Sequence, residues 1–156
     1  MDIFSHGLWG RGLFGYRGYP GLALFFGILP DLFSFGIFAV IRIFEGNFQM
    51  GPPPLDIIPD WVIFNYNLSH SFITALVIIG AIAIRKKDMA FAMLGWPLHI
   101  MMDFPFHTRN YFPTQFLWPL TDFTIDGIPW SHPLVWFPNL AGIIILYIYR
   151  FKQKRD

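Results

Sequence analysis

The sequence predicts an all-α integral membrane protein, folded as one domain over residues 1–156 with about four short or interrupted membrane helices. Of these residues 54% are hydrophobic, 20% are aromatic and only 13% are charged. The mean hydropathy is +0.47. Such a composition is typical of membrane proteins and unusual for soluble domains. The predicted fold is therefore a membrane-embedded helical bundle.

Apolar runs locate the predicted helices at residues 20–44, 64–84, 89–104 and 132–149. A full crossing needs about 20 apolar residues, and runs of this kind favour helix. Prolines at positions 30, 97 and 138 interrupt three of the runs, so we expect some spans to be partial or kinked. Segments 45–63 and 105–131 are rich in proline and glycine and are predicted to be loops.

Basic residues predict how the helices are oriented. Seven of the eleven Lys and Arg residues form two clusters, which are Arg85, Lys86 and Lys87, and Arg150, Lys152, Lys154 and Arg155. Each cluster follows an apolar run, and both should face the cytoplasm. Two crossings, 89–104 and 132–149, would return the chain to that side. His70, Asp103, His107 and the 105–131 loop would then gather at the outer face. A straight helix over 20–44 would instead leave Asp31 near mid-membrane.

Four ionisable residues lie within or beside the apolar runs: Asp31, His70, His99 and Asp103. An ionisable side chain inside a membrane is costly unless it pairs, faces a cavity or binds an ion. His99 and Asp103 lie one helical turn apart on one face, where both can reach the same ion. Pro105 should end that helix, which places His107 on the next turn, able to fold back over the site.

The ligand types restrict the metal. The chain has no cysteine, so a transition-metal site must use histidine and carboxylate. These ligands suit zinc, manganese or iron, whereas histidine disfavours calcium. A divalent metal, with zinc as the first candidate, is therefore the predicted cofactor.

The same residues also have structural interpretations. His99 and Asp103 can form a hydrogen-bonded pair that makes a buried carboxylate tolerable. The stretch NLSHSF resembles a helix N-terminus with Asn67 or Ser69 as the cap, in which case His70 is only interfacial. Asp31 can cap a helix that begins after Pro30. His6 and His132 are more typical of interfacial residues than of ligands.

Three motifs occur in order along the chain: GILPD at 27–31, NLSHSF at 67–72, and GWPLHIMMD at 95–103, the last followed by FLWPL at 116–120. Together they resemble the bacterial membrane-bound metal-dependent hydrolase family, the LexA-regulated inner-membrane hydrolases. Those proteins are similar to zinc-dependent phospholipase C and to zinc-dependent single-strand nucleases. The resemblance covers most of the chain.

The resemblance implies a phospholipase C-like helical arrangement and a set of metal ligands, which are His6, Asp31, His70, His99 and Asp103. HIMMDFPFHTRN is further similar to the phospholipase motif, which adds His107 as a ligand. The family's His-Arg-Gly lead reads Asn65-Tyr66-Asn67 here, and no late His-x-x-x-Glu pair is present. One or two metal ions are therefore expected in place of three.

The predicted function is hydrolysis of a phosphodiester or phospholipid by metal-activated water. Asp31 or Asp103 could serve as the general base instead of as a ligand if the site holds only one ion. The partners are membrane lipids, and the location is a bacterial or archaeal cytoplasmic membrane. A net charge of +1 gives no reason to expect nucleic acid as a partner.

Two alternatives remain open from the sequence. One is a non-catalytic membrane protein with a structural metal or polar site, and the other is a metal or proton transporter. Transport predicts polar residues spread through the membrane depth, whereas hydrolysis predicts polar residues gathered at one face beside an open cavity.

Overall fold

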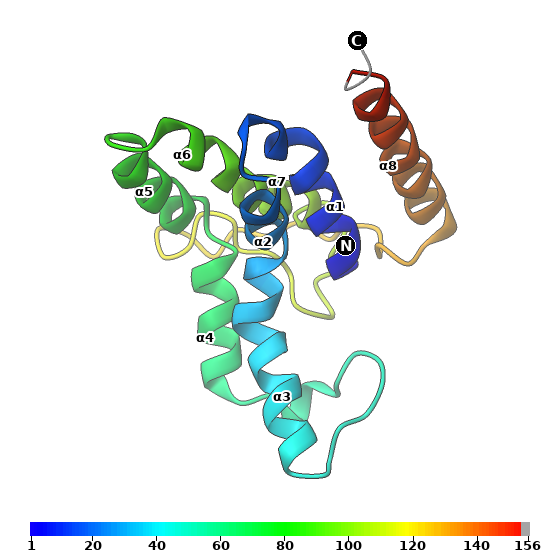
Figure 1. The fold of residues 1–156 in the computed structure, drawn as a ribbon. Coiled ribbons are helices and arrows are strands. Elements are labelled where there is room, and N and C mark those ends of the chain that lie inside the picture. Colours follow the sequence, from blue (N-terminus) through cyan, green and yellow to red (C-terminus); the bar gives the residue numbers. More distant parts are fainter. Residues whose placement is uncertain (154–156) are drawn as a thin grey trace.

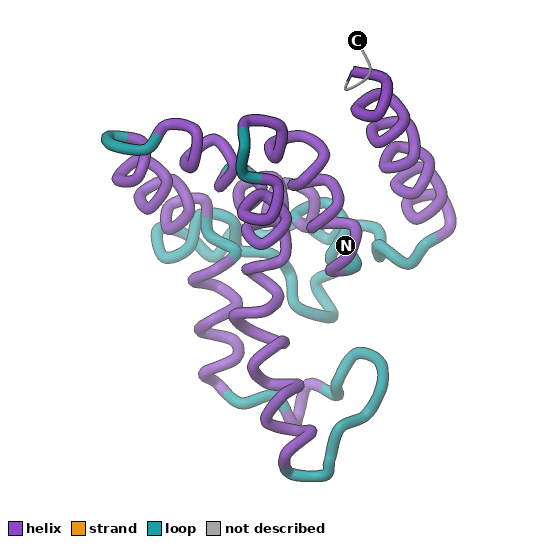
Figure 2. The backbone as a smooth tube through the Cα atoms, viewed as in Figure 1, coloured by secondary structure: helices purple, strands orange, loops and turns teal. Residues whose placement is uncertain are grey.

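The computed structural model describes residues 1–153, and these form helices joined by loops, with no strand among them (Figures 1 and 2). The α-helices are α1 (Ile3–Phe14), α2 (Pro20–Asp31), α3 (Ile37–Phe44), α4 (Asp60–Ser69), α5 (Phe72–Ala83), α6 (Lys87–Met93), α7 (Gly95–Asp103) and α8 (Pro133–Gln153). Short helices η1 (Gly15–Arg17), η2 (Leu32–Gly36) and η3 (Leu55–Ile57) lie between them. The all-α prediction is confirmed for this part of the chain. Lys154 and Arg155 of the second basic cluster lie outside the described residues.

Two helices are long and apolar enough to cross a membrane. They are Pro20–Phe44, in which α2, η2 and α3 form one helix of 25 residues, and Pro133–Gln153, which is α8, with 21 residues. Helices α4 and α5 count as a third span only if they are taken as one broken helix, because they meet at 54°. The structure thus has two or three candidate spans, and the four that were predicted are not confirmed.

The run 89–104 accounts for part of this difference. It divides at Leu94 into α6 and α7, of seven and nine residues. At about 1.5 Å per residue neither helix can cross a hydrocarbon layer of about 30 Å. Both pack within the bundle instead, where Met93, Trp96 and Ile100 are buried.

The prolines interrupt the helices less than the sequence predicts. Pro30 and Pro138 both lie inside continuing helices. After Pro30 the helix widens into η2, a π-helix in which the N–H of Ile37 bonds the carbonyl of Leu32, five residues earlier. Pro97 lies in the first turn of α7, where the backbone N–H groups have no helical partner in any case.

The two predicted loops are present, with one change in their bounds. The first ends earlier than residue 63, because α4 begins at Asp60, directly after Pro59. Figure 2 shows this loop at one end of the molecule. The second loop connects α7 to α8 without a helix of its own, as predicted.

Glycines bring three helices into backbone contact at the centre of the bundle. A Cβ atom added at Gly27 of α2 would lie 2.5 Å from the carbonyl oxygen of His6 in α1. One added at Gly95 of α7 would lie 2.7 Å from the carbonyl oxygen of Ala23 in α2. Only glycine permits such an approach of backbones, as in other membrane helix contacts. Helices α1, α2 and α7 therefore hold their side chains at fixed, short separations.

Polar contacts attach α8 to α1 at the edge of the bundle (Figure 1). The indole N–H of Trp9 donates to the side-chain carbonyl of Asn139 at 2.8 Å, and the amide of Asn139 donates to the hydroxyl of Ser5 at 2.8 Å. Near the other end of α8, the Nε of Arg150 donates to the carbonyl of Gly12 at 2.8 Å. A polar residue inside an apolar helix thus finds its partners on the neighbouring helix.

The basic clusters lie at the same end of the molecule. Figure 1 shows the turn between α5 and α6, which carries Arg85 and Lys86, at the same end as the C-terminal end of α8 with Arg150. The loop after Phe44 lies at the opposite end. This arrangement agrees with the prediction that both basic clusters face the same side of the membrane.

Replacing Gly27 tests the contact between α1 and α2. Gly27→Ala should lower the melting temperature of the detergent-purified protein, because its Cβ would meet backbone that cannot turn aside, at a cost of about 1–3 kcal/mol. Gly21→Ala is the control in the same helix, since nothing lies within 4 Å of its Cβ. It should preserve or raise the melting temperature, because alanine favours helix. Equal melting temperatures for the two variants would contradict the packing described here.

Cysteine labelling tests the side on which each end of the molecule lies. The chain has no cysteine, so Lys86→Cys and Met50→Cys each introduce a single thiol, and both positions are exposed. An impermeant maleimide should label Met50→Cys in intact cells and Lys86→Cys only after the membrane is opened. Labelling of both variants in intact cells would overturn the crossing by Pro20–Phe44.

Candidate metal centre

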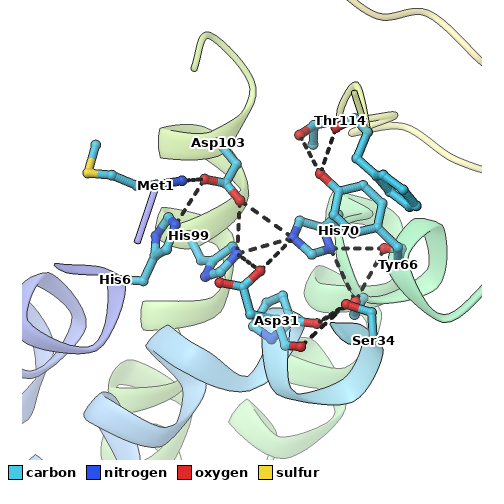
Figure 3. Close-up of polar contacts among 12 residues, drawn as sticks. Met1, His6, Asp31, Ser34, Tyr66, His70, His99, Asp103 and Thr114 are labelled. Atoms are coloured by element: carbon cyan, nitrogen blue, oxygen red, sulfur yellow. Dashed lines mark hydrogen bonds and ion pairs between the residues drawn. The ribbon is translucent and has the colours of Figure 1, made fainter. Parts of the chain in front are cut away.

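Four polar side chains from three separate segments point to one volume (Figure 3). Asp31 comes from the end of α2, His70 from the break between α4 and α5, and His99 and Asp103 from α7. One ligand atom of each lies within 4.8 Å of those of the other three, so the group could hold a metal ion. The structure thus brings together the four ionisable residues that the sequence singled out.

Five distances between these ligand atoms are close to those expected around a tetrahedral ion. The Nε2 atoms of His70 and His99 are 3.2 Å apart. The Oδ2 of Asp103 is 3.5 Å from the first and 3.2 Å from the second. The Oδ1 of Asp31 is 3.7 Å from both. Ligands bound at about 2.0–2.2 Å to a tetrahedral ion lie about 3.3–3.6 Å from one another.

The outer nitrogens of both histidines show which atoms face this volume. The Nδ1 of His70 lies 3.0 Å from the carbonyl of Tyr66, and the Nδ1 of His99 lies 2.7 Å from the carbonyl of Gly27. Because a carbonyl can only accept, each Nδ1 carries a hydrogen, and in the neutral ring each Nε2 then has a free lone pair. Backbone carbonyls orient metal-binding histidines in the same way.

When both imidazoles are neutral, two imidazole lone pairs and two carboxylates surround the volume between the four residues. The Oδ2 of Asp103 is buried and has no hydrogen-bond partner among the described residues. A buried acceptor without a donor is costly, and a bound ion is one of its ordinary explanations. The four candidate ligands and their geometry thus fit a divalent cation.

Asp31 is held at this position by the turn that follows Pro30. The carbonyl of Pro30 accepts hydrogen bonds from the hydroxyls of Ser34 at 3.0 Å and Ser69 at 3.1 Å. Ser69 thereby ties the end of α4 to α2, next to His70. The side chain of Asp31 is 21% exposed, while the other three are buried. The group of four candidate ligands thus reaches the surface through the side chain of Asp31.

His70 lies outside regular helix because α4 ends and α5 begins around it. The predicted caps, Asn67 and Ser69, are wrong, since both residues lie inside α4. Ser71 is the cap of α5, with its hydroxyl accepting a backbone N–H at 3.1 Å. The same hydroxyl donates to the carbonyl of Trp118 at 2.5 Å. The loop between α7 and α8 thus holds in place the break between α4 and α5, where His70 lies.

His6 contacts Asp103 and does not join the group of four. Its Nε2 lies 2.9 Å from the Oδ1 of Asp103, which the amino group of Met1 also contacts. Its ring stacks on that of His99, with the centroids 3.6 Å apart. Burial, followed by the neighbouring His99, lowers the pKa of His6 to about 4. His6 is therefore neutral, and its Nε2–H donates to the carboxylate.

His107 lies on the turn after α7, as predicted, on another side of Asp103. Its Nε2 is 3.6 Å from the Oδ2 of Asp103. Its Nδ1 lies 2.8 Å from the carbonyl of Phe112, which orients the ring. Burial lowers the pKa of His107 below its ordinary value. His6 and His107 thus flank the shared carboxylate, one at each oxygen.

Tyr66 was not predicted, although it supports two of the histidines. Its ring stacks on His70 with centroids 3.8 Å apart. Its hydroxyl lies 3.1 Å from both the Nδ1 of His107 and the Oγ1 of Thr114. The spacing was a signal, because a residue four positions before His70 lies on the same helical face. His132, by contrast, accepts a backbone N–H at the start of α8, apart from this group.

Two cavities of the described chain lie away from the four candidate ligands. One of about 150 Å³ is between α3 and the loop after it, and another of about 610 Å³ is between α1 and α8. Neither is lined by any of the four candidate ligands. The predicted open cavity beside the site is therefore not one of these two, and the exposed edge of Asp31 is the route by which the site reaches the surface.

No protein-family model, curated protein or solved structure matches the chain.

Proposed function

We propose that the protein is a membrane-bound, metal-dependent hydrolase in which Asp31, His70, His99 and Asp103 hold a divalent ion, with zinc as the first candidate. One observation carries this proposal: two imidazole nitrogens and two carboxylates face one volume, and five of the distances between their ligand atoms are 3.2–3.7 Å. Imidazole and carboxylate are ordinary ligands of zinc, and also suit manganese or iron.

A bound divalent ion would supply a Lewis acid and lower the pKa of a water molecule towards neutrality. Four protein ligands would leave a single tetrahedral ion no position for water, so in the catalytic state Asp31 would serve as the general base and not as the fourth ligand. Asp31 fits this role better than Asp103, because its carboxylate is partly exposed while that of Asp103 is buried and already bonded to His6. His6 and His107 would orient Asp103 and so fix one ligand. A second ion beside His6 or His107 belongs to the same proposal.

The substrate class follows from the approach to Asp31. Leu32 and Phe33, which adjoin it, are exposed apolar residues in a helix that is long enough to span a membrane. An apolar approach to a polar site suits an amphiphile, so we propose a phospholipid or another membrane-bound phosphodiester. The resemblance to the bacterial hydrolase family supports this choice, together with a phospholipase C-like arrangement and a bacterial or archaeal cytoplasmic membrane.

A structural ion is the second candidate. Three of the four ligands are buried, and four protein ligands complete a tetrahedron as they do in structural zinc sites. Such an ion would hold α2, α7 and the α4–α5 break together without turnover. Transport is less well supported, because the ionisable residues gather in one group and are not distributed along the helices.

Metal content tests the ligand set. His99→Ala and Asp103→Asn should each lower the metal bound to detergent-purified protein at least tenfold, since each removes one of four ligands. His132→Ala is the control, because that histidine lies apart from the group. Inductively coupled plasma mass spectrometry provides the measurement. Equal metal content in all three variants would exclude this site.

Catalysis is tested at Asp31. Asp31→Asn should lower hydrolysis of a chromogenic phosphodiester, or of phosphatidylcholine in mixed micelles, by about 100-fold, because it removes the proposed base. Asp122→Asn is the matched control at an exposed carboxylate of the long loop, and it should keep full activity. A chelator should abolish turnover, and added zinc should restore it. Metal-loaded protein that hydrolyses neither substrate would favour the structural ion.

A further inference from the structure

The larger of the two cavities is lined by none of the residues of the candidate metal centre. It has a volume of about 610 Å³ and lies where η1 and the C-terminal ends of α1 and α8 meet. Figure 1 shows these ends at the same end of the molecule as the α5–α6 turn, which carries the other basic cluster. The cavity therefore opens where a membrane protein of this orientation meets lipid head groups.

The charge of the cavity is positive. Arg11 and Arg150 both line it, and no carboxylate within residues 1–153 does. Arg150 is committed to the fold, because it donates to the carbonyl of Gly12 and lies 4.3 Å from the centre of the Tyr16 ring. Arg11 is exposed, and its guanidinium has no hydrogen bond or ion pair among the described residues. Its donors are thus available to an anion, and guanidinium matches phosphate in geometry.

An apolar track leads away from this cavity along α8. Exposed side chains recur there every three or four residues, on one face of the helix: Phe137, Leu140, Ile144, Ile148 and Phe151. Phe151 also lines the cavity. The track is about 21 Å long at 1.5 Å per residue, which exceeds the roughly 15 Å of one leaflet's hydrocarbon. The positively charged cavity thus lies at one end of an exposed apolar face of α8 that is as long as an acyl chain.

We propose that this cavity binds the head group of an anionic phospholipid, with one acyl chain along the exposed face of α8. Two arginines without an acidic partner among residues 1–153 favour a net negative head group over a zwitterionic one. The apolar track favours a lipid over a free anion. The bound lipid would contact both α1 and α8 and so stabilise their packing.

The test is thermal unfolding of the full chain in detergent with three additives: dioctanoyl phosphatidylglycerol, dioctanoyl phosphatidylcholine and inorganic phosphate. Phosphatidylglycerol should raise the melting temperature in a saturable manner, and the other two should not. Arg11→Gln should weaken phosphatidylglycerol binding about tenfold, the loss expected for one charge-assisted hydrogen bond. The guanidinium of Arg11 has no hydrogen bond or ion pair with the part of the chain that the structure describes, so the lipid-free melting temperature should stay that of the wild type.

The control is Arg85→Gln, which removes one charge from the exposed α5–α6 turn at the same end of the molecule. It should bind phosphatidylglycerol as the wild type does. An equal loss in both variants would overturn the proposal in favour of general attraction to anionic micelles. An equal shift with phosphatidylcholine would exclude head-group selection, and saturation by phosphate alone would exclude the lipid.

A second variant tests the track. Ile148→Ser should also weaken phosphatidylglycerol binding, because it places a hydroxyl in the acyl path, and unchanged binding would overturn the proposed position of the chain. Asp31→Asn should bind the lipid normally. The result is therefore independent of whether the metal centre is catalytic.

Discussion

Backbone contact between α1, α2 and α7 is the constraint on which the candidate site depends. Gly27 and Gly95 permit it, and at this separation the carbonyl of Gly27 can orient His99 while the ring of His6 stacks on the same imidazole. In a membrane, lipid would offer little hydrophobic drive for helices to associate, so close packing and hydrogen bonds between helices would supply it. The polar group at the centre is thus both a product of this packing and a part of what maintains it.

Three different local backbone structures position the candidate ligands at the centre. Asp31 precedes a π-helix, His70 occupies the break between two helices, and His99 and Asp103 use the ordinary one-turn spacing of α7. Irregular backbone is tolerated at membrane depth only where protein satisfies it, and the hydroxyls of Ser69 and Ser71 do so here. Departures from regular helix therefore gather around the group of four, which is typical of functional sites.

The sequence identified the candidate ligands because an ionisable side chain is energetically costly in an apolar segment. Asp31, His70, His99 and Asp103 could be recognised because ionisable side chains in apolar runs need a reason to be there. Features set by tertiary packing could not be read in this way. His6 meets Asp103 across 97 positions, and no periodicity encodes that contact. The continuation of two helices through proline, and the division of the third run into two short helices, likewise depend on neighbouring segments.

The bend of 54° between α4 and α5 has a mechanical consequence. His70 stands at the vertex of this bend, so an ion that fixes its imidazole also fixes the angle between the two helices. Helix α4 has ten residues, and along its length of about 15 Å any rotation at the vertex is amplified. Binding of an ion at the centre would then set the position of the far end of α4, where the loop from α3 joins it.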